Sequence, residues 1–396
     1  MSGNAQLSVA KQTKNDEFYT QFGDIQNEMN AYYEYDHDVF RGKTILLPCD
    51  DPEWSNFTRY FATNFERFGI KKLISTSYAK GIGNKQTTLL ESNSPHYSKE
   101  KHDAHGKLFI LQRDVDGSGN IDTDDIEFTG YLKDDGDFRS DEVTKLRDEA
   151  DIIITNPPFS LFKEFINWIL EGDKKFIILG NKNAITYKEI FPLIKENRIW
   201  LGYTPLSKDI FFKVPEEYGK WMLENKKEGS TYRIVDGTVM GRASACWFTN
   251  EDHGRRHELL TLDTMEHNLK FNKKLRKNFE KEYGVIEYKG YDNYDALEVP
   301  YVECIPSDYD GMMGVPISFM DKYNPDQFEI MGMCENLDLY GLKTKTYTSQ
   351  ECKDRYFEIF GKKGTYDLNA SGVVNGMKVY QRILVRRKGD GSGTAH

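Results

Sequence analysis

The sequence predicts an α/β protein that is built on a mostly parallel sheet. From residue 42 to about residue 250, short apolar runs that suit buried strands alternate with amphipathic segments that suit helices. The clearest run, residues 151–155, contains three consecutive isoleucines, which is typical of a strand buried on both faces. The strand is expected to end before Pro157 and Pro158, because proline cannot donate a hydrogen bond within a sheet. A helical pattern starts directly afterwards.

Helix boundaries are marked by capping residues. Ser55 is placed to cap an amphipathic helix that Gly69 ends, and Ser160 is placed to cap the helix after the two prolines. The strand–helix–strand order around the first of these helices is typical of the start of a doubly wound sheet. Strands are predicted at residues 42–52, 71–78, 108–111, 151–155, 175–181, 199–203, 244–250, 314–320 and 379–385, and helices within residues 16–34 and at residues 55–69, 141–149, 161–170, 187–196 and 324–332.

Composition divides the chain into regions. Residues 79–135 are polar and rich in glycine and acidic residues, and we interpret them as an insertion into a first domain that spans residues 16–250. Residues 251–388 are dominated by Tyr, Asn, Asp and Lys, and we interpret them as a C-terminal region of mixed α+β structure. Residues 1–15 are expected to form a flexible arm and residues 389–396 a disordered tail.

The charge of the chain is negative overall but uneven. The 396 residues carry a net charge of −10, which taken alone argues against a nucleic-acid partner. However, residues 269–289 carry seven basic side chains against three acidic ones, and residues 380–388 carry four basic side chains and no acidic one. A local basic face is compatible with DNA binding, and a solvated helix or strand surface explains each run equally well.

Cysteine spacing and hydropathy limit the cellular setting. The five cysteines are scattered without CxxC spacing, which indicates a reducing cytosol and no zinc site. No apolar run reaches the length that spans a membrane, and no N-terminal segment has the pattern of a signal peptide. A cytoplasmic protein is therefore expected.

The proline turn carries a specific chemistry. Asn156 and Phe159 follow the isoleucine strand at its carboxyl end, where open α/β sheets bind ligands. The Asn156 side-chain carbonyl and the Pro157 backbone carbonyl can each accept one N–H of an amine on an aromatic ring, which holds the nitrogen and favours a nucleophilic geometry. Phe159 can stack on that ring. The turn therefore predicts group transfer to an aromatic amine, and a plain strand-ending turn is the alternative.

An acidic stretch follows the pattern of a calcium-binding EF-hand loop. Its candidate ligands are Asp114, Asp116, Ser118, Asn120 through its backbone carbonyl, and Asp125. The last ligand is Asp instead of Glu, and a predicted strand, not a helix, leads into the loop. A calcium ion here would be structural, and a solvated acidic turn is the alternative.

Several segments together resemble the EcoRI-type adenine-specific DNA methyltransferases, which transfer a methyl group from S-adenosylmethionine to N6 of adenine. These segments touch most of the elements predicted above. They are DEFYTQ at residues 16–21, CDDPEWSNF at 49–57, GDFRS at 136–140, TNPPFSLFKE at 155–164, ITYKE at 185–189, IWLG at 199–202, YDNYDA at 291–296, DYDGMMGVPISF at 308–319 and YNPDQFE at 323–329.

The resemblance implies a Rossmann-like sheet that binds S-adenosylmethionine and a C-terminal α+β region that recognises the target. Residues 18–20 are expected to cover the methionine end of the cofactor, and residues 48–51 to meet it at the first strand. Asp137 is expected to accept from the cofactor's adenine amine and Phe138 to lie against its ring, while the proline turn is the implied catalytic site. The implied cofactor-binding residues are Phe18, Tyr19, Thr20, Pro48, Cys49, Asp50, Asp51, Asp137 and Phe138.

The chain departs from the general methyltransferase pattern in two places. The loop after the first strand lacks the usual Gly-x-Gly, and the strand at residues 71–78 does not end in the acidic residue that commonly holds the cofactor ribose. Asp50 and Asp51 are therefore the remaining candidates for the ribose contacts. An Asx-type turn before Pro52, without a ligand, is the alternative for both.

The resemblance also implies partners. The substrate would be double-stranded DNA, with the target adenine flipped out at a cost of roughly a few kcal/mol, and sequence choice would come from residues after 200. The enzyme would be monomeric and bacterial or phage-encoded, working with a cognate restriction endonuclease or alone. Two alternatives remain open: an N-methyltransferase that acts on RNA or on a protein glutamine through the same turn, and a catalytically inactive DNA-binding relative.

Overall fold

The computed structural model describes residues 19–51, 53, 55–79, 94–98, 100–101, 104–214, 216–363 and 372–388. The predicted arm, Phe18 and the predicted tail lie outside these residues. The chain divides into two compact units, Met1–Ile190 with Ile199–Gly254 and Phe191–Arg198 with Arg255–His396. Residues 191–198 belong to the second unit although the first unit resumes at residue 199, and this arrangement was not anticipated from the sequence. No helix in the described part of the chain is long and apolar enough to cross a bilayer.

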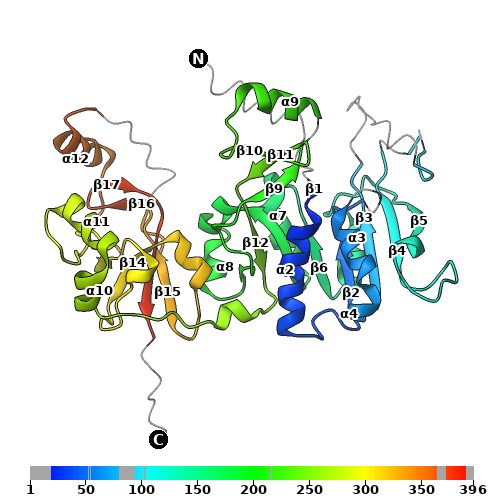
Figure 1. Ribbon diagram of the computed structural model, residues 1–396, viewed down its shortest axis with the longest axis horizontal. Helices are drawn as coiled ribbons and strands as arrows, with labels where there is room; N and C mark the ends of the chain where they lie inside the picture. The colour runs from blue at the N-terminus through cyan, green and yellow to red at the C-terminus, as the bar shows by residue number, and fades with distance from the viewer. Residues whose placement is uncertain are drawn as a thin grey trace, which may run out of the picture. The chain divides into compact units, whose positions relative to one another are not determined.

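An eight-stranded mixed sheet forms the centre of the first unit (Figure 1). Four neighbouring strands in its middle run parallel, and the strands on either side join through antiparallel pairs. The predicted α/β class is confirmed, with more antiparallel pairing than expected. In sheet order the strands are β5 (Glu127–Tyr131), β4 (Lys107–Leu111), β3 (Lys72–Thr76), β2 (Thr44–Leu47), β6 (Ile152–Thr155), β7 (Lys175–Asn181), β12 (Ala245–Thr249) and β8 (Trp200–Leu201).

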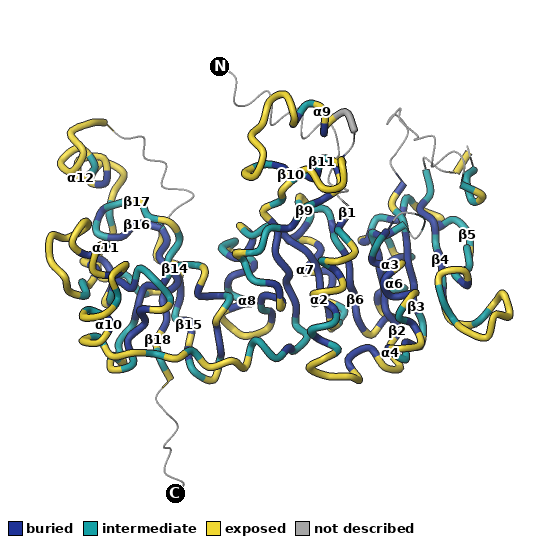
Figure 2. Tube along the Cα trace, viewed as in Figure 1, coloured by how far each residue is buried: buried dark blue, intermediate teal, exposed yellow. Residues whose placement is uncertain are grey.

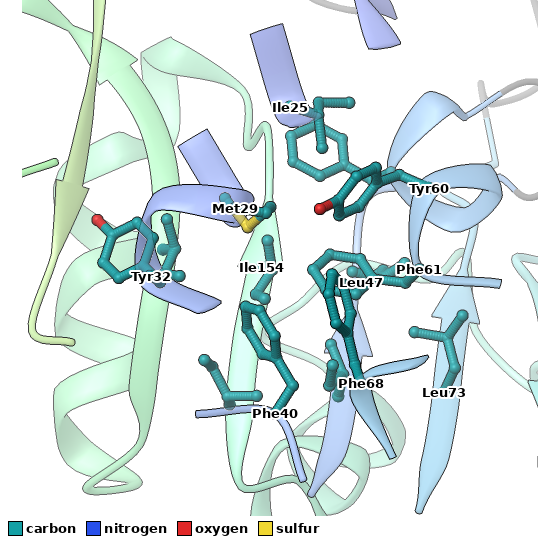
Figure 3. Close-up of a cluster of buried hydrophobic side chains, with 14 of the residues drawn as sticks. Ile25, Met29, Tyr32, Phe40, Leu47, Tyr60, Phe61, Phe68, Leu73 and Ile154 are labelled. Atoms are coloured by element: carbon teal, nitrogen blue, oxygen red, sulfur yellow. The ribbon is translucent and has the colours of Figure 1, made fainter. Parts of the chain in front are cut away.

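Helices cover the isoleucine strand, β6, on both faces. Ile152 and Ile154 belong to a large buried cluster that the helices before and after β2 complete with aromatic side chains (Figure 3). Ile153 is equally buried but points to the opposite face, because side chains alternate along a strand. Figure 2 shows the strands buried between more exposed connections. The helices are α2 (Phe22–Tyr35), α3 (Asn56–Thr63), α4 (Phe65–Phe68), α6 (Asp141–Glu149) and α7 (Phe162–Glu171).

Two of the three predicted caps are confirmed. The Ser55 hydroxyl accepts a hydrogen bond from the backbone N–H of Phe57 at 3.1 Å, and Gly69 ends α4 in the left-handed conformation, with φ 65°. The prediction for Ser160 is wrong, because α7 begins after Leu161. A short 3₁₀ turn, η2 (Phe159–Leu161), comes first, since the two prolines hold the chain extended before a helix can start.

The segment interpreted as an insertion, residues 79–135, contributes to the main sheet. Besides β4, which was predicted, it contains β5, and the two strands extend the sheet beyond β3 through antiparallel pairs. Ile121 and Ile126, which flank the 3₁₀ turn η1 (Thr123–Asp125), pack against the core cluster. The acidic loop is therefore anchored at its end by apolar contacts.

A smaller antiparallel sheet of the first unit includes the predicted cofactor segment. Its strands, in order, are β1 (Tyr19–Thr20), β9 (Ile210–Lys213), β11 (Thr238–Ala243) and β10 (Tyr232–Val235), and α9 (Glu216–Asn225) contacts β11. Thr20 lies opposite Phe212 in β9. The N-terminal segment is thus held by a strand that comes almost two hundred residues later in the chain.

The Glu28 side chain bonds α2 to the segment that precedes β9. Its fully buried carboxylate accepts backbone hydrogen bonds from Tyr203 at 2.6 Å and Thr204 at 2.7 Å, and a hydroxyl hydrogen bond from Tyr32 at 3.2 Å. Burial raises the pKa of Glu28, and these donors oppose the rise. Gly202 is required beside it, because a Cβ there would lie 2.2 Å from the Glu28 carboxylate.

The second unit contains a four-stranded sheet, a two-stranded hairpin and helices. Residues 324–332 were predicted to be helical but form most of strand β15, because Phe328 and Ile330 are buried in alternation with exposed Glu329. The strand expected at residues 314–320 ends early and continues as a 3₁₀ helix, η6 (Ile317–Lys322). The elements are β13 (Ala296–Glu298), β14 (Met312–Pro316), β18 (Arg382–Arg387), β15 (Phe328–Met333), β16 (Gly372–Val374), β17 (Met377–Val379), α8 (Phe191–Lys195), α10 (Met265–Phe271), α11 (Lys273–Tyr283) and α12 (Ser349–Phe360).

Candidate active site

The carboxyl ends of β2 and β6 meet where the order of the main sheet reverses. The chain passes from β2 to its neighbour β3 on one side, and later returns to pair β6 with the other side of β2. Ligands of open α/β sheets bind outside such switch points. Residues 48–51 follow β2 and residues 156–159 follow β6, so the structure brings the predicted cofactor loop and the predicted catalytic turn to the same edge.

Asp50 connects these two segments through its buried carboxylate. The residue is 7% exposed, and its carboxylate accepts hydrogen bonds from the hydroxyls of Thr155 at 2.6 Å and Ser55 at 2.7 Å. Its backbone N–H donates to the carbonyl of Thr76 at 2.9 Å. One residue therefore joins the ends of β2, β3 and β6 to the start of α3. It also constrains the position of Asn156, which follows Thr155 directly.

The two acids of the loop differ in environment. Burial raises the pKa of Asp50 to about 6, and the Thr155 and Ser55 hydroxyls oppose part of the rise. Burial also raises the pKa of Asp51, and the Lys107 ammonium, 3.3 Å from its carboxylate, opposes the rise. The Asp51 side chain is 21% exposed. Asp50 is thus placed to position other residues, while Asp51 is the more accessible acceptor for a ligand.

The loop after β2 is also pinned at its start. Pro48 is buried, and its carbonyl accepts a hydrogen bond from the Thr76 hydroxyl at 2.9 Å. Cys49 is only partly buried. The loop is therefore rigid on the side of β3, with Cys49 and Asp51 as its more exposed side chains.

Thr20 reaches the same edge from the smaller sheet. Its carbonyl accepts a hydrogen bond from the Asn56 side chain, at the start of α3, at 2.8 Å. Its hydroxyl oxygen is buried and has no hydrogen-bond partner within the described part of the chain. Because leaving a buried hydroxyl without a partner costs about 1–3 kcal/mol, this position fits a polar group of a bound cofactor. Tyr19 is described by its backbone alone.

The proline turn presents two acceptors and a ring. The Pro158 carbonyl accepts a hydrogen bond from the Leu161 N–H at 2.9 Å and is thereby committed to the turn. No hydrogen bond from the described residues reaches the Pro157 carbonyl, which stays available to a ligand. Asn156 is partly buried, and the partly buried Phe159 packs against the core cluster. The turn can therefore offer a fixed ring and carbonyl oxygens to a planar amine.

Asp137 lies in the loop before α6, held close to the end of β3. Gly136 adopts φ 83° and approaches Ser77 so closely that a Cβ would lie 2.2 Å from the Ser77 carbonyl. The Asp137 carboxylate forms an ion pair with Arg139 at 2.6 Å, and hydrogen bonding to Arg139 lowers the pKa of Asp137. Asp137 is therefore an ionised acceptor beside the carboxyl edge of the sheet.

The stacking role predicted for Phe138 does not fit its position. Phe138 is 4% exposed, and its ring packs edge to face against Phe165 and Trp168 of α7, with centroids 4.9 and 5.5 Å away. Tyr78, just after β3, is 40% exposed. Burial raises the pKa of Tyr78, and the charges of Asp135 and Asp137 add to the rise. The Ala79 N–H donates to the Asp135 carbonyl at 2.7 Å, which holds Tyr78 beside the loop that carries Asp137. Tyr78, not Phe138, is the accessible ring beside Asp137.

Three residues of this edge were not predicted. Ser55 was expected only as a helix cap, and neither Thr155 nor Tyr78 was assigned a role. Hydroxyl residues at caps and strand ends are too common in sequences to signal a carboxylate bridge. Tyr78 was recognisable in principle, because it ends a predicted strand at the edge where ligands bind.

The acidic loop brings three of its five predicted ligands together. Carboxylate oxygens of Asp114, Asp116 and Asp125 lie within 4.8 Å of one another. Asp125 accepts hydrogen bonds from the backbone N–H groups of residues 115, 122 and 116, which lower its pKa. The Ser118 hydroxyl donates to the Asn120 carbonyl at 3.1 Å. These bonds within the loop are equally those of an acidic turn without a metal.

Sequence comparison identifies related proteins. The pattern of the family described as "Adenine-specific methyltransferase EcoRI" matches residues 6–388. Type II methyltransferase M.EcoRI of Escherichia coli is 40% identical over 336 residues, which cover 85% of this chain and 91% of that protein. Type II methyltransferases M.MgeORF184P of Mycoplasma genitalium and M.MpnI of Mycoplasma pneumoniae are each 31% identical, over 96% and 85% of this chain and 98% and 89% of their own lengths.

The family match spans both compact units, and each relative is matched over most of its length. No solved structure matches the chain. Two of the segments that resemble the family, residues 49–57 and 155–164, contain the loop and the turn that Asp50 joins at one sheet edge. The chain belongs to the family of EcoRI-type adenine-specific methyltransferases.

Proposed function

We propose that the protein methylates N6 of adenine in double-stranded DNA, with the target base held at residues 156–159 and S-adenosylmethionine held beside it. The observation that carries this assignment is the Asp50 carboxylate, which joins the loop after β2 to Thr155, the residue before Asn156. In this proposal the main sheet is a Rossmann-like cofactor-binding sheet, and the second unit, from residue 255, recognises the target sequence.

On the substrate side, two carbonyl oxygens orient the amine. The Asn156 side-chain oxygen and the Pro157 backbone oxygen each accept one N–H of the adenine N6, which concentrates the nitrogen lone pair away from the ring. Pro157 suits this role because its carbonyl has no other partner among the described residues. After transfer the extra amine proton leaves to water, so the turn requires no general base.

Phe159 stabilises the base outside the duplex. Extruding a base costs roughly a few kcal/mol, and stacking on an aromatic side chain recovers part of that cost. Because Phe159 packs against the core cluster, its ring is held in place before the base arrives. Little ordering of this side chain is then needed on binding.

On the cofactor side, the proposed contacts come from four segments: β1, the loops after β2 and β3, and the loop before α6. S-adenosylmethionine supplies a methyl group on a positively charged sulfur, which makes the methyl carbon electrophilic. The Thr20 hydroxyl and the Asp51 carboxylate provide hydrogen-bond partners for its amino-acid and ribose portions. Asp137 accepts from its adenine amine, and Tyr78 takes the stacking role first assigned to Phe138. Asp50 acts as a positioning residue.

The other expectations remain predictions from the resemblance. No observation favours RNA or protein glutamine as the acceptor, or an inactive relative. A monomeric enzyme in the cytoplasm, with or without a cognate endonuclease, is still expected. Transfer of tritiated methyl groups to DNA, RNA and protein in parallel would separate the acceptors, because only DNA should become labelled.

Replacing Asn156 should separate catalysis from cofactor binding. Asn156→Ala removes one of the two acceptors that orient the amine, so methyl transfer to DNA should fall by a factor of 100 or more, on the order of other positioned groups. Asn156→Asp keeps an oxygen acceptor and should retain measurable activity. Tritiated-methyl transfer gives the rates, and calorimetry should show unchanged cofactor affinity for both variants. Normal turnover by Asn156→Ala would rule out this role.

Thr20→Val should have opposite effects on the free protein and on cofactor binding. The substitution removes a buried hydroxyl without a partner, so it should stabilise the free protein by about 1 kcal/mol and weaken cofactor binding by about tenfold. Thr58→Val is the matched control, because the buried Thr58 hydroxyl bonds to Ser75 at 3.0 Å and its loss should destabilise the protein. Urea unfolding and calorimetry measure both effects. Destabilisation by Thr20→Val equal to that of the control would contradict the proposal.

The pKa of Asp50 predicts a pH dependence. The pKa of Asp50 is about 6 in the folded protein, above its usual 3.8, so folding at a pH between these two values is accompanied by uptake of a proton. The contribution of Asp50 to stability therefore declines as the pH rises from 4 through 6. The ionised bridge to Thr155 predominates only above pH 6. We therefore expect the methyl-transfer rate to fall below about pH 6.

Asp50→Asn should lower the methyl-transfer rate about tenfold near neutral pH. It should also remove the fall in rate at acidic pH (the acid limb of the pH–rate profile), because the amide does not titrate. The pH–rate profiles of the two proteins test the assignment. An acid limb that persists unchanged in Asp50→Asn would show that another group titrates.

The acidic loop stays a predicted structural calcium site. If Asp114, Asp116 and Asp125 hold an ion, calcium chloride should raise the thermal unfolding temperature by a few degrees, roughly the effect of a ligand near 100 times its Kd. Asp114→Asn should abolish the shift. Equal unfolding temperatures with calcium and with chelator would assign the loop as an acidic turn.

A further inference from the structure

A hollow of about 380 Å³ lies in the second unit, over the loop that contains the YDNYDA segment. Three tyrosines, Tyr291, Tyr294 and Tyr309, line it together with Asp295 and neighbouring residues of the loop. Hollows of this size that combine aromatic side chains with a few polar groups are typical of sites for small organic ligands or their parts. The proposed methyl transfer assigns no role to this hollow.

The side chains of the loop are bonded to the rest of the unit, with one exception. Asp292 accepts from a tyrosine hydroxyl, Asn293 is buried and bonded at both ends of its amide, and the Tyr294 hydroxyl bonds to backbone. Their partners are Tyr347, Val373, Asn375 and Glu335. Within the described residues, the Asp295 carboxylate has no hydrogen bond or ion pair, and neither has the Tyr309 hydroxyl. These two polar groups are left for a ligand in the hollow.

The backbone holds Asp295 in place. The Tyr291 N–H donates to the Ala296 carbonyl at 2.9 Å, and the Ala296 N–H donates to the Tyr294 carbonyl at 2.8 Å. Ala296 then begins β13, which pairs with β14. Asp295 and Tyr309 both line the hollow. Burial raises the pKa of Tyr309, and the charge of Asp295 adds to the rise. A ligand would meet an acceptor and a ring that are already positioned.

The chemistry of the hollow disfavours anions and suits a ligand with N–H donors. A carboxylate accepts hydrogen bonds and repels phosphate, while tyrosine rings pack against a planar ring. In DNA, Asp and Glu accept from the amino groups of bases, above all from cytosine N4. Lys345 follows Thr344 at the rim and is exposed, so a cation is available for the DNA backbone nearby.

We propose that this hollow reads one base of the target sequence, with Asp295 accepting from the base's amino group and Tyr309 lying against its ring. The inference rests on the proposed function, since it requires DNA as the substrate. It assigns to the second unit a base-specific contact, in contrast to a contact with the phosphate backbone alone.

The experiment compares sequence discrimination. Single-molecule sequencing of DNA methylated by the unmodified protein defines the target sequence, and rates are then measured on duplexes with each position changed in turn. Asp295→Asn should reduce discrimination at one position by about tenfold, the usual scale for one specific contact. Discrimination at the other positions, cofactor affinity and thermal stability should not change.

Asp310→Asn is the matched control. Its side chain is 91% exposed and lies next to Tyr309 in sequence, so the substitution removes one negative charge from the same neighbourhood. It should strengthen DNA binding at all sequences alike, because removing negative charge favours contact with phosphates. If Asp295→Asn has only this uniform effect, the base-reading role is overturned.

Tyr309→Ala provides a second variant, which removes the ring of the partly exposed Tyr309 and keeps the charge of Asp295. It should weaken discrimination at the same position as Asp295→Asn, and an effect at a different position would overturn the shared site. Absence of adenine methylation by the unmodified protein would overturn the proposed function itself, and with it this site. The two failures are therefore distinguishable.

Discussion

The buried carboxylate of Asp50 holds together the segments of the first unit at the sheet edge proposed as the active site. It is neutralised by no cation within the described residues; two hydroxyls, from Ser55 and Thr155, share its charge instead. Burial without a counter-ion is why its pKa rises to about 6. The arrangement is energetically costly, and a bridge of this kind is retained where geometry matters more than stability. The loop after β2 and the turn after β6 cannot move independently while it is intact.

The parts of the fold that follow from local rules were predictable. The isoleucine strand could be predicted from its own composition and from the prolines that follow it. The helix cap at Ser55 and the helix end at Gly69 could be predicted from neighbouring residues alone. Local rules failed where distant segments decide the outcome. In the polar segment at residues 79–135, β5 forms a strand because it pairs with the edge of β4. The sequence of β15 also suited a short helix, but it forms a strand because it pairs with β18.

The candidate site shows the same division. A resemblance between sequences identifies positions, and it was sufficient to single out the loop at residues 48–51 and the turn at residues 156–159. It does not say which way a side chain points. The Asp50 side chain points inward to two hydroxyls, and the Phe138 ring packs inward against α7. The accessible ring beside Asp137 is that of Tyr78, for which the sequence predicted no role. Side-chain direction depends on packing around the whole sheet, and short motifs do not contain that information.

The pairing of β1 with β9 has a consequence for how the enzyme is made. Thr20 leaves the ribosome early, yet its strand partner ends at Lys213, and the backbone groups that bond to Glu28 lie just before that strand. At a synthesis rate of roughly 5–20 residues per second, the residues at these two positions are added about 10 to 40 seconds apart. During that time β1 and α2 lack these partners, so the proposed cofactor site is among the last features of this unit to form.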